Sequence, residues 1–136
     1  DLVPSEVTRL LGCEPDDASE AGKPLRSGST KRTKFGQWSL ELRPENTDEW
    51  DCGEAMRELL QRLPSDVGLW KELTRKYQVN VTFALLMTSS NKGFALPPEI
   101  MNYLGTRGIT AGFDIYYEGD EIAEPDAAPM RRPTSG

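Results

Sequence analysis

Residues 79–88, with the sequence VNVTFALLMT, decide the fold class. Every second residue from Val79 to Met87 is apolar, and most of the residues between them are polar or small. This two-residue period is typical of a half-buried β-strand. Residues 109–118, ITAGFDIYYE, repeat the pattern with their apolar side chains at the odd positions. Helical start and stop signals predict a helix between the two strands, from about Pro97 to Thr106, so this part of the chain predicts a β-α-β unit.

The preceding part of the chain predicts one more strand and three helices. Residues 37–43, QWSLELR, alternate like a strand, and residues 3–12 predict a helix that ends at Gly12. A second helix, capped by Asn46 or Thr47, ends at Pro64, and a third begins at Ser65 or Asp66; we expect these two helices to form a hairpin. The prediction is an α+β fold, a two-layer sandwich with helices on one face of a mixed β-sheet, ferredoxin-like or split β-α-β, with an inserted helical hairpin.

Four short motifs carry a resemblance to a known family. They are the opening LVPSEVTRLLG of residues 2–12, Gly36-x-Trp38-Ser39, the Leu59-Leu60 pair and the GFDIY of residues 112–116. Together they resemble a bacterial family, the domain of unknown function 4279, over roughly residues 1–117. Its members usually begin with a strand ahead of the first helix, which leaves open whether a leading strand was trimmed from this chain. The resemblance implies a small accessory or immunity-type protein and brings no catalytic residues.

Length and composition limit the remaining possibilities. The 136 residues suit one domain over residues 1–118, followed by an acidic, Pro-containing tail over 119–136 that we expect to be disordered. With 16 Lys and Arg against 22 Asp and Glu, the net charge is −6, which argues against a nucleic-acid partner. The absence of His excludes a Ser-His-Asp triad and a His-based zinc site.

The cysteines and the hydropathy indicate a compartment. Two free thiols are favoured over a disulfide between Cys13 and Cys52, although that pairing stays open. No stretch approaches the length and apolarity of a membrane span, and no signal-peptide pattern opens the chain. We therefore expect a cytoplasmic protein with no membrane partner.

The polar face of the predicted sheet is the first candidate binding surface. In one shared sheet this face would display the side chains between the apolar positions, and polar groups on rigid strands hold their geometry well. Trp50, among acids at a predicted helix start, is a candidate interface anchor if it is exposed. The candidate residues on the sheet are Asn80, Thr82, Asp114 and Tyr116, and the face would also carry Gln37, Ser39 and Glu41.

A basic loop is the second candidate. Five positive charges and no acid lie between Lys23 and Lys34, and Lys31, Arg32 and Lys34 are the residues expected to hold a phosphate or an acidic partner. The glycines and lysines do not fit the phosphate-loop pattern. The acids after Glu118 lack EF-hand spacing, so no metal site and no cofactor is predicted.

Two functions from different classes follow. The first is a non-enzymatic interaction or accessory protein of immunity type, whose acidic surface binds a basic partner protein. The alternative is a small-ligand or phosphate-binding protein, with an enzyme not excluded, that uses the basic loop 23–34 and the open sheet face. The sequence does not decide whether the chain is an enzyme, although it favours a protein that is not one, and it singles out no catalytic residue. A homodimer also stays open.

Overall fold

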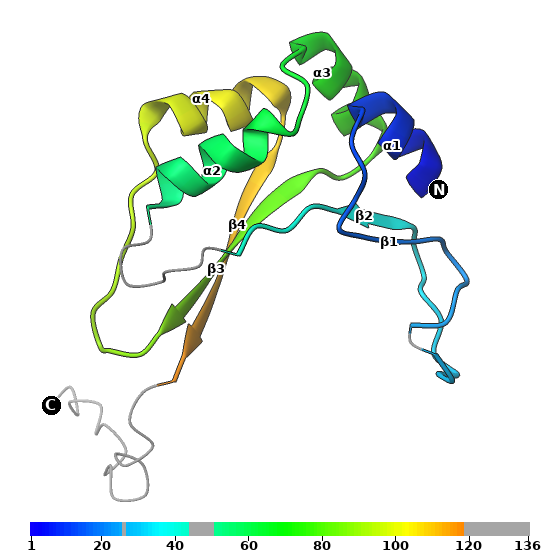
Figure 1. The fold of residues 1–136 in the computed structure, drawn as a ribbon, viewed down its shortest axis with the longest axis horizontal. Coiled ribbons are helices and arrows are strands. Elements are labelled where there is room, and N and C mark those ends of the chain that lie inside the picture. The colour runs from blue at the N-terminus through cyan, green and yellow to red at the C-terminus, as the bar shows by residue number, and fades with distance from the viewer. Residues whose placement is uncertain (26, 44–50, 119–136) are drawn as a thin grey trace, which may run out of the picture. The chain divides into compact units, whose positions relative to one another are not determined.

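The computed structural model describes residues 1–25, 27–43 and 51–118 and has the α+β composition predicted from the sequence (Figure 1). Helices and strands follow in an irregular order along the described residues. The helices are α1 (Pro4–Leu11), α2 (Cys52–Gln61), α3 (Val67–Lys76) and α4 (Pro98–Arg107). The strands are β1 (Asp17–Ser19), β2 (Gln37–Ser39), β3 (Asn80–Met87) and β4 (Thr110–Tyr117).

The chain divides into two compact units. The first contains residues 1–80 and 94–110, and therefore holds all four helices with β1 and β2. The second contains residues 81–93 and those from 111 on, and therefore holds most of β3 and β4. The expected single domain over 1–118 stays a prediction.

The ends of α1 and α3 agree with the sequence signals. Helix α1 begins at Pro4 and ends at Gly12, whose φ of 70° lies in the left-handed region where glycine has no steric penalty. Helix α3 is capped by Asp66, whose carboxylate accepts hydrogen bonds from the backbone N–H groups of Gly68 and Leu69. Each end satisfies backbone groups that the helix itself leaves unpaired.

The start of α2 differs from the prediction, whereas α4 agrees with its predicted range to within one residue. Asp51 caps α2 by accepting from the backbone N–H of Glu54 at 3.0 Å, whereas the predicted caps, Asn46 and Thr47, lie outside the described residues. Helix α4 continues through Gly105 to Arg107, and Gly108 ends it with a φ of 74°. Helix α3 packs against α4, and the hairpin expected of the second and third helices stays a prediction.

The described strands form two two-stranded sheets instead of the single mixed sheet expected from the sequence. Strand β2 pairs antiparallel with β1, with Asp17 opposite Ser39. Strand β1 was not predicted, because Asp-Ala-Ser has no apolar alternation to mark a strand. The polar face expected for one shared sheet is therefore divided, with Gln37 and Ser39 in one sheet and the candidate residues of β3 and β4 in the other.

Strands β3 and β4 form the predicted β-α-β unit with α4 between them in sequence, and they run parallel (Figure 1). The backbone N–H of Thr110 donates to the carbonyl of Val79, and that of Glu118 donates to the carbonyl of Met87. Donor and acceptor thus advance together along the two strands, as parallel pairing requires. The rings of Phe83 and Phe113 stack with centroids 5.4 Å apart, so the apolar residues of both strands lie on the same face.

The core of the first unit gathers residues from α1 and α3. Val7, Leu11, Trp70 and Leu73 are each at most 6% exposed. Trp38 packs partly buried against this cluster and donates its indole N–H to the hydroxyl of Thr8 at 3.0 Å. Both Trp38 and Trp70 therefore lie in the core, as their positions on apolar faces predicted.

A buried arginine joins α4 to the turn between α2 and α3. Arg107 is 9% exposed, and its guanidinium donates to the backbone carbonyls of Ser65 at 2.7 Å and Tyr103 at 3.2 Å. The same guanidinium lies 3.6 Å from the centroid of the Tyr103 ring. The adjacent carbonyl of Pro64 accepts from the Trp70 indole at 2.7 Å and from the Tyr103 hydroxyl. Three side chains thus satisfy two successive carbonyls of this turn.

Removal of the Arg107 charge should destabilise the protein. Arg107→Met keeps much of the volume but leaves the carbonyl of Ser65 without its donor, so we expect the free energy of unfolding to fall by about 2–4 kcal/mol. Urea denaturation followed by circular dichroism measures the loss. Arg75→Met, at an exposed position of α3, is the matched control and should change stability by less than about 0.5 kcal/mol. Equal losses in the two variants would contradict the role of Arg107.

Two glycines should respond in opposite directions to alanine. A Cβ on the buried Gly36 would overlap the backbone carbonyl of Leu2, so Gly36→Ala should destabilise by about 1–3 kcal/mol. A Cβ on Gly105, inside α4, would meet nothing within 4 Å, so Gly105→Ala should stabilise by about 0.5–1 kcal/mol. Denaturation midpoints of the two variants test the expected loss and the expected gain of stability. A Gly36→Ala variant as stable as the wild type would show that the Leu2 carbonyl does not lie against Gly36.

Candidate interaction surfaces

The four candidate residues of the second sheet lie on one face, as their spacing predicted. Asn80, Thr82, Asp114 and Tyr116 occupy alternating exposed positions of β3 and β4. The Tyr116 hydroxyl donates to the Asp114 carboxylate at 3.4 Å, a long hydrogen bond between exposed groups. Thr82 lies beside Gly112 of the neighbouring strand. A Cβ added to Gly112 would lie 3.7 Å from the hydroxyl oxygen of Thr82. On this face Asn80 and Thr82 lie at the start of β3, whereas Asp114 and Tyr116 lie in the second half of β4, beside Ala84 and Leu86.

The opposite face of the same sheet departs from the prediction of a buried layer. Phe83 and Leu85 of β3 are buried, with 6% and 8% exposure. Phe113 and Ile115 of β4 alternate in the same phase but are 50% and 64% exposed, and Tyr117 is also 64% exposed. Alternation fixes the side to which a residue points, whereas burial also requires a neighbour that covers it. The apolar side chains of β4 are therefore more exposed than those of β3.

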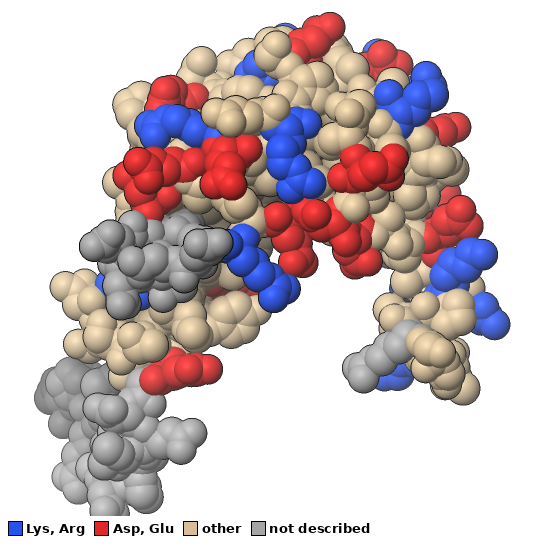
Figure 2. Space-filling model, viewed as in Figure 1, with Lys and Arg blue, Asp and Glu red and all other residues tan. Residues whose placement is uncertain are grey.

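The described residues of the basic loop, 22–25 and 27–34, pair as a hairpin, which we call the basic hairpin. Its two sides exchange backbone hydrogen bonds from Thr33 to Lys23 and from Leu25 to Lys31, and Pro24 pairs with Arg32. Figure 2 shows basic side chains at this end of the first unit, to the lower right.

The three candidate cations of the basic hairpin do not converge. Lys31 and Arg32 are successive residues of one side of the ladder, so their side chains point to opposite faces. The Arg32 guanidinium also donates to the carbonyl of Gly22 at 2.7 Å. Lys34 is exposed and lies two residues from Arg32. Lys31 and Arg32 therefore extend from opposite faces of the hairpin.

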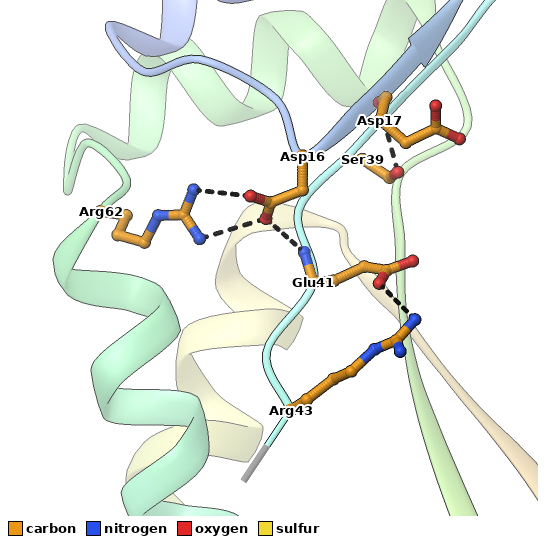
Figure 3. A network of polar contacts seen from close by, with 6 residues as sticks. All are labelled: Asp16, Asp17, Ser39, Glu41, Arg43 and Arg62. Carbon is orange, nitrogen blue, oxygen red and sulfur yellow. Dashed lines mark hydrogen bonds and ion pairs between the residues drawn. The ribbon is translucent and has the colours of Figure 1, made fainter. Parts of the chain in front are cut away.

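An acidic network lies at the β1–β2 sheet (Figure 3). The Asp16 carboxylate accepts from the backbone N–H of Glu41 at 2.7 Å and from the Arg62 guanidinium at 3.2 Å. The Glu41 carboxylate accepts from Arg43 at 3.1 Å, and the carbonyl of Asp17 accepts from the hydroxyl of Ser39. The backbone hydrogen bond from Glu41 and then that from Arg62 lower the pKa of Asp16, since both favour its charged form.

A shallow hollow of 380 Å³ lies between α2 and α4. Arg57 of α2 and Glu99 of α4 form an ion pair at its rim, with a second hydrogen bond from the Arg57 Nε at 2.8 Å. The hydrogen bonds and the charge of Glu99 raise the pKa of Arg57. Tyr103 contributes to the lining, and burial raises the pKa of its hydroxyl. The two charges of the hollow are thus already paired with each other.

The remaining sequence candidates fall in three groups. Both cysteines are free thiols, and burial raises the pKa of Cys13 and of Cys52, which opposes the reactive thiolate form. Trp50 and the acids after Glu118 lie outside the described residues. Within the described ranges, no cluster of three or more Cys, Asp or Glu side chains could hold a metal ion.

Several polar contacts of the structure were not predicted from the sequence. Asp16 and Arg62, Arg57 and Glu99, and Arg107 and Ser65 are each more than 40 residues apart. Charged residues on helix surfaces are usually solvated, so composition and periodicity offer no signal that selects these pairs.

The comparison with known families agrees with the resemblance that the four sequence motifs carry. A family model described as a domain of unknown function (DUF4279) matches residues 1–118. The chain belongs to this family. None of the curated proteins and none of the solved structures matches. No helix in the described part of this DUF4279 chain is long and apolar enough to cross a membrane.

The Asp16 network should make stability depend on pH. Because the pKa of Asp16 is lowered in the folded state, its stabilising effect is present above the ordinary value of 3.8 and is lost as the pH falls through the folded-state pKa. Asp16→Asn should therefore be less stable than the wild type at pH 7, and the difference should disappear at sufficiently acidic pH. Denaturation at a series of pH values measures it, with Asp17→Asn as the control that should show little difference throughout.

Proposed function

We propose that this protein is a non-enzymatic interaction module that binds a basic partner protein through an acidic surface. The observation that carries the proposal is the separation of charge along the chain. The net charge is −6, and the five cations between Lys23 and Lys34 leave −11 for the rest of the chain. Such a field steers a cationic partner toward the acidic part of the surface and away from the hairpin.

The acidic strand face, which we define as Asp16, Asp17 and Glu41, supports this proposal. All three are exposed at the β1–β2 sheet, where Asp16 points toward Arg62 and the carboxylates of Asp17 and Glu41 point to the other side (Figure 3). Hydrogen bonds hold Asp16 to Arg62 and to the backbone of Glu41, so part of this face is already ordered before a partner arrives. Order in the free protein lowers the entropy lost on binding.

The biological role that fits this proposal is of the immunity type. A small acidic protein that forms a complex with a basic toxin protein would act by occupying its surface, without a chemical step. We expect it to act in the cytoplasm, where the two free thiols would stay reduced.

The alternative of phosphate binding by the basic hairpin has weaker support. Five cations attract an anion of any kind, but the alternation along the ladder directs Lys31 and Arg32 to opposite faces. Strong phosphate sites direct several donors to one point. This difference favours the interaction module over a small-anion site.

Charge reversal on the acidic strand face tests the proposal. The wild type and the double variant Asp17→Lys/Glu41→Lys are used as bait with an extract of the source cells, and the retained proteins are identified by mass spectrometry. We expect the wild type to retain a basic protein, and we expect its affinity for the variant to be at least tenfold lower. Binding to the wild type should also weaken as salt is added.

The control variant is Glu58→Lys/Glu72→Lys, which makes the same change in net charge at exposed helix positions. It should retain the partner with nearly the affinity of the wild type. If both double variants lose the partner equally, then net charge and not this face determines binding. If no protein is retained while a metabolite co-purifies, the interaction module is the wrong function.

A further inference from the structure

The basic hairpin leads away from the small sheet that carries it. In Figure 1 the chain between β1 and β2 runs outward from both strands, at the lower right. The hydrogen bonds that hold this segment join residues 20–34 to one another, such as the bond from the Leu25 N–H to the Lys31 carbonyl. The hairpin is therefore a narrow projection beyond these two strands that is held by its own backbone.

Both faces of this projection carry a cation. Pro24 lies opposite Arg32, and Leu25 bonds to Lys31 one step nearer the turn. Because neighbouring residues of a strand point to opposite sides, Lys31 and Arg32 extend from different faces. The segment 23–34 contains five cations and no acidic residue. The hairpin thus presents positive charge on both of its faces.

An exposed apolar side chain lies near the end of the hairpin. Leu25 is 55% exposed, and its backbone bonds to that of Lys31. Residues 27–30, which follow in the turn, are Ser, Gly, Ser and Thr and carry no charge. An apolar side chain among cations is typical of segments that enter the surface of an anionic membrane. The apolar group is buried there, while the cations stay beside the lipid phosphates.

The shape of the hairpin selects among anionic partners. A site for a small anion directs several donors to one point, whereas Lys31 and Arg32 extend from opposite faces. A folded acidic protein presents one rigid surface and contacts mainly one face of a hairpin. The headgroup layer of a membrane is fluid and surrounds whatever enters it, so it contacts both faces at once. This difference favours a membrane.

We propose that the end of the basic hairpin inserts into the headgroup layer of an anionic membrane. Leu25 enters the boundary between headgroups and acyl chains, and Lys31 and Arg32 bind lipid phosphates on either side of it. Lys34 lies two residues from Arg32, about 7 Å along the strand and within the Debye length of about 8 Å. The sequence expectation of no membrane partner rested on the absence of a membrane-spanning stretch, and a surface contact requires none.

The charge of the remaining residues orients the protein on such a membrane. The net charge is −6, and the five cations between Lys23 and Lys34 leave −11 for the rest of the chain. An anionic surface attracts the hairpin and repels the acidic part, so the hairpin approaches first. This binding uses no residue of the acidic strand face. Its failure would therefore leave the proposed binding of a basic partner unaffected.

Sedimentation of the full chain with lipid vesicles tests the proposal. We expect binding to phosphatidylcholine vesicles that contain about 30% phosphatidylserine, no binding to phosphatidylcholine alone, and weaker binding as salt is added. Lys31→Gln/Lys34→Gln should weaken binding at least about tenfold, since each cation near the surface strengthens it about fivefold. Lys71→Gln/Lys76→Gln, with the same change in net charge on α3, should bind like the wild type.

Two apolar substitutions test which part of the hairpin enters the membrane. Leu25→Ser should weaken binding about threefold or more, because its side chain no longer leaves water. Phe35→Ser should bind like the wild type although Phe35 is 71% exposed, because it lies about 13 Å along the strand from Lys31. Circular dichroism establishes that all variants are folded. A wild type that ignores anionic vesicles or binds both kinds equally, or equal affinities of these two variants, would overturn the proposal.

A fluorescent label tests whether both faces enter the membrane. A fluorophore that responds to polarity is attached to Pro24→Cys or to Leu25→Cys, in a Cys13→Ser background in which Cys52 is buried. Emission from both positions should shift to shorter wavelength on anionic vesicles, whereas a label on Glu72→Cys of α3 should not respond. A shift at only one of positions 24 and 25 is expected of a flat contact, such as that with an acidic protein, and would refute insertion.

Discussion

The helical part of this protein depends on a charge held inside it. The guanidinium of Arg107 lies over the Tyr103 ring and donates to the carbonyls of Ser65 and Tyr103. The turn that joins α2 to α3 has two successive carbonyls directed to the interior, and carbonyls buried without donors are costly. Arg107 supplies one donor, while Trp70 and Tyr103 supply donors to the other. The end of α4, the turn and the Trp70 core position are therefore fixed together.

The sequence predicted local features better than long-range ones. Proline and glycine marked the ends of α1, Asp66 capped α3, and alternation identified β3 and β4. These features depend on neighbours a few residues away, so the pattern contains the necessary information. The pairing of β2 with β1 was not predictable in this way, because β1 consists of Asp, Ala and Ser and has no period of its own. Likewise, no local rule connects Arg107 with a carbonyl 42 residues earlier in the chain.

The candidate surfaces show the same difference between local features, which were predicted, and long-range ones, which were not. The alternation that grouped Asn80, Thr82, Asp114 and Tyr116 on one face was correct for the sheet that contains them. The same alternation was not enough to bury Phe113 and Ile115, because the burial of a strand residue depends on what covers that face. The basic hairpin gives the converse case. Its composition suggested one anion site, whereas its backbone pairing separates Lys31 from Arg32.

Nuclear magnetic resonance of the Arg107 side chain tests the central role of this buried charge. The Nε–H of Arg107 is buried without a hydrogen-bond acceptor among the described residues and is shielded from water. We predict a resolved Nε–H signal that exchanges slowly with solvent at neutral pH and shows a nuclear Overhauser effect to the Tyr103 ring protons. Exchange as fast as that of the exposed Arg75, without a contact to Tyr103, would contradict the account.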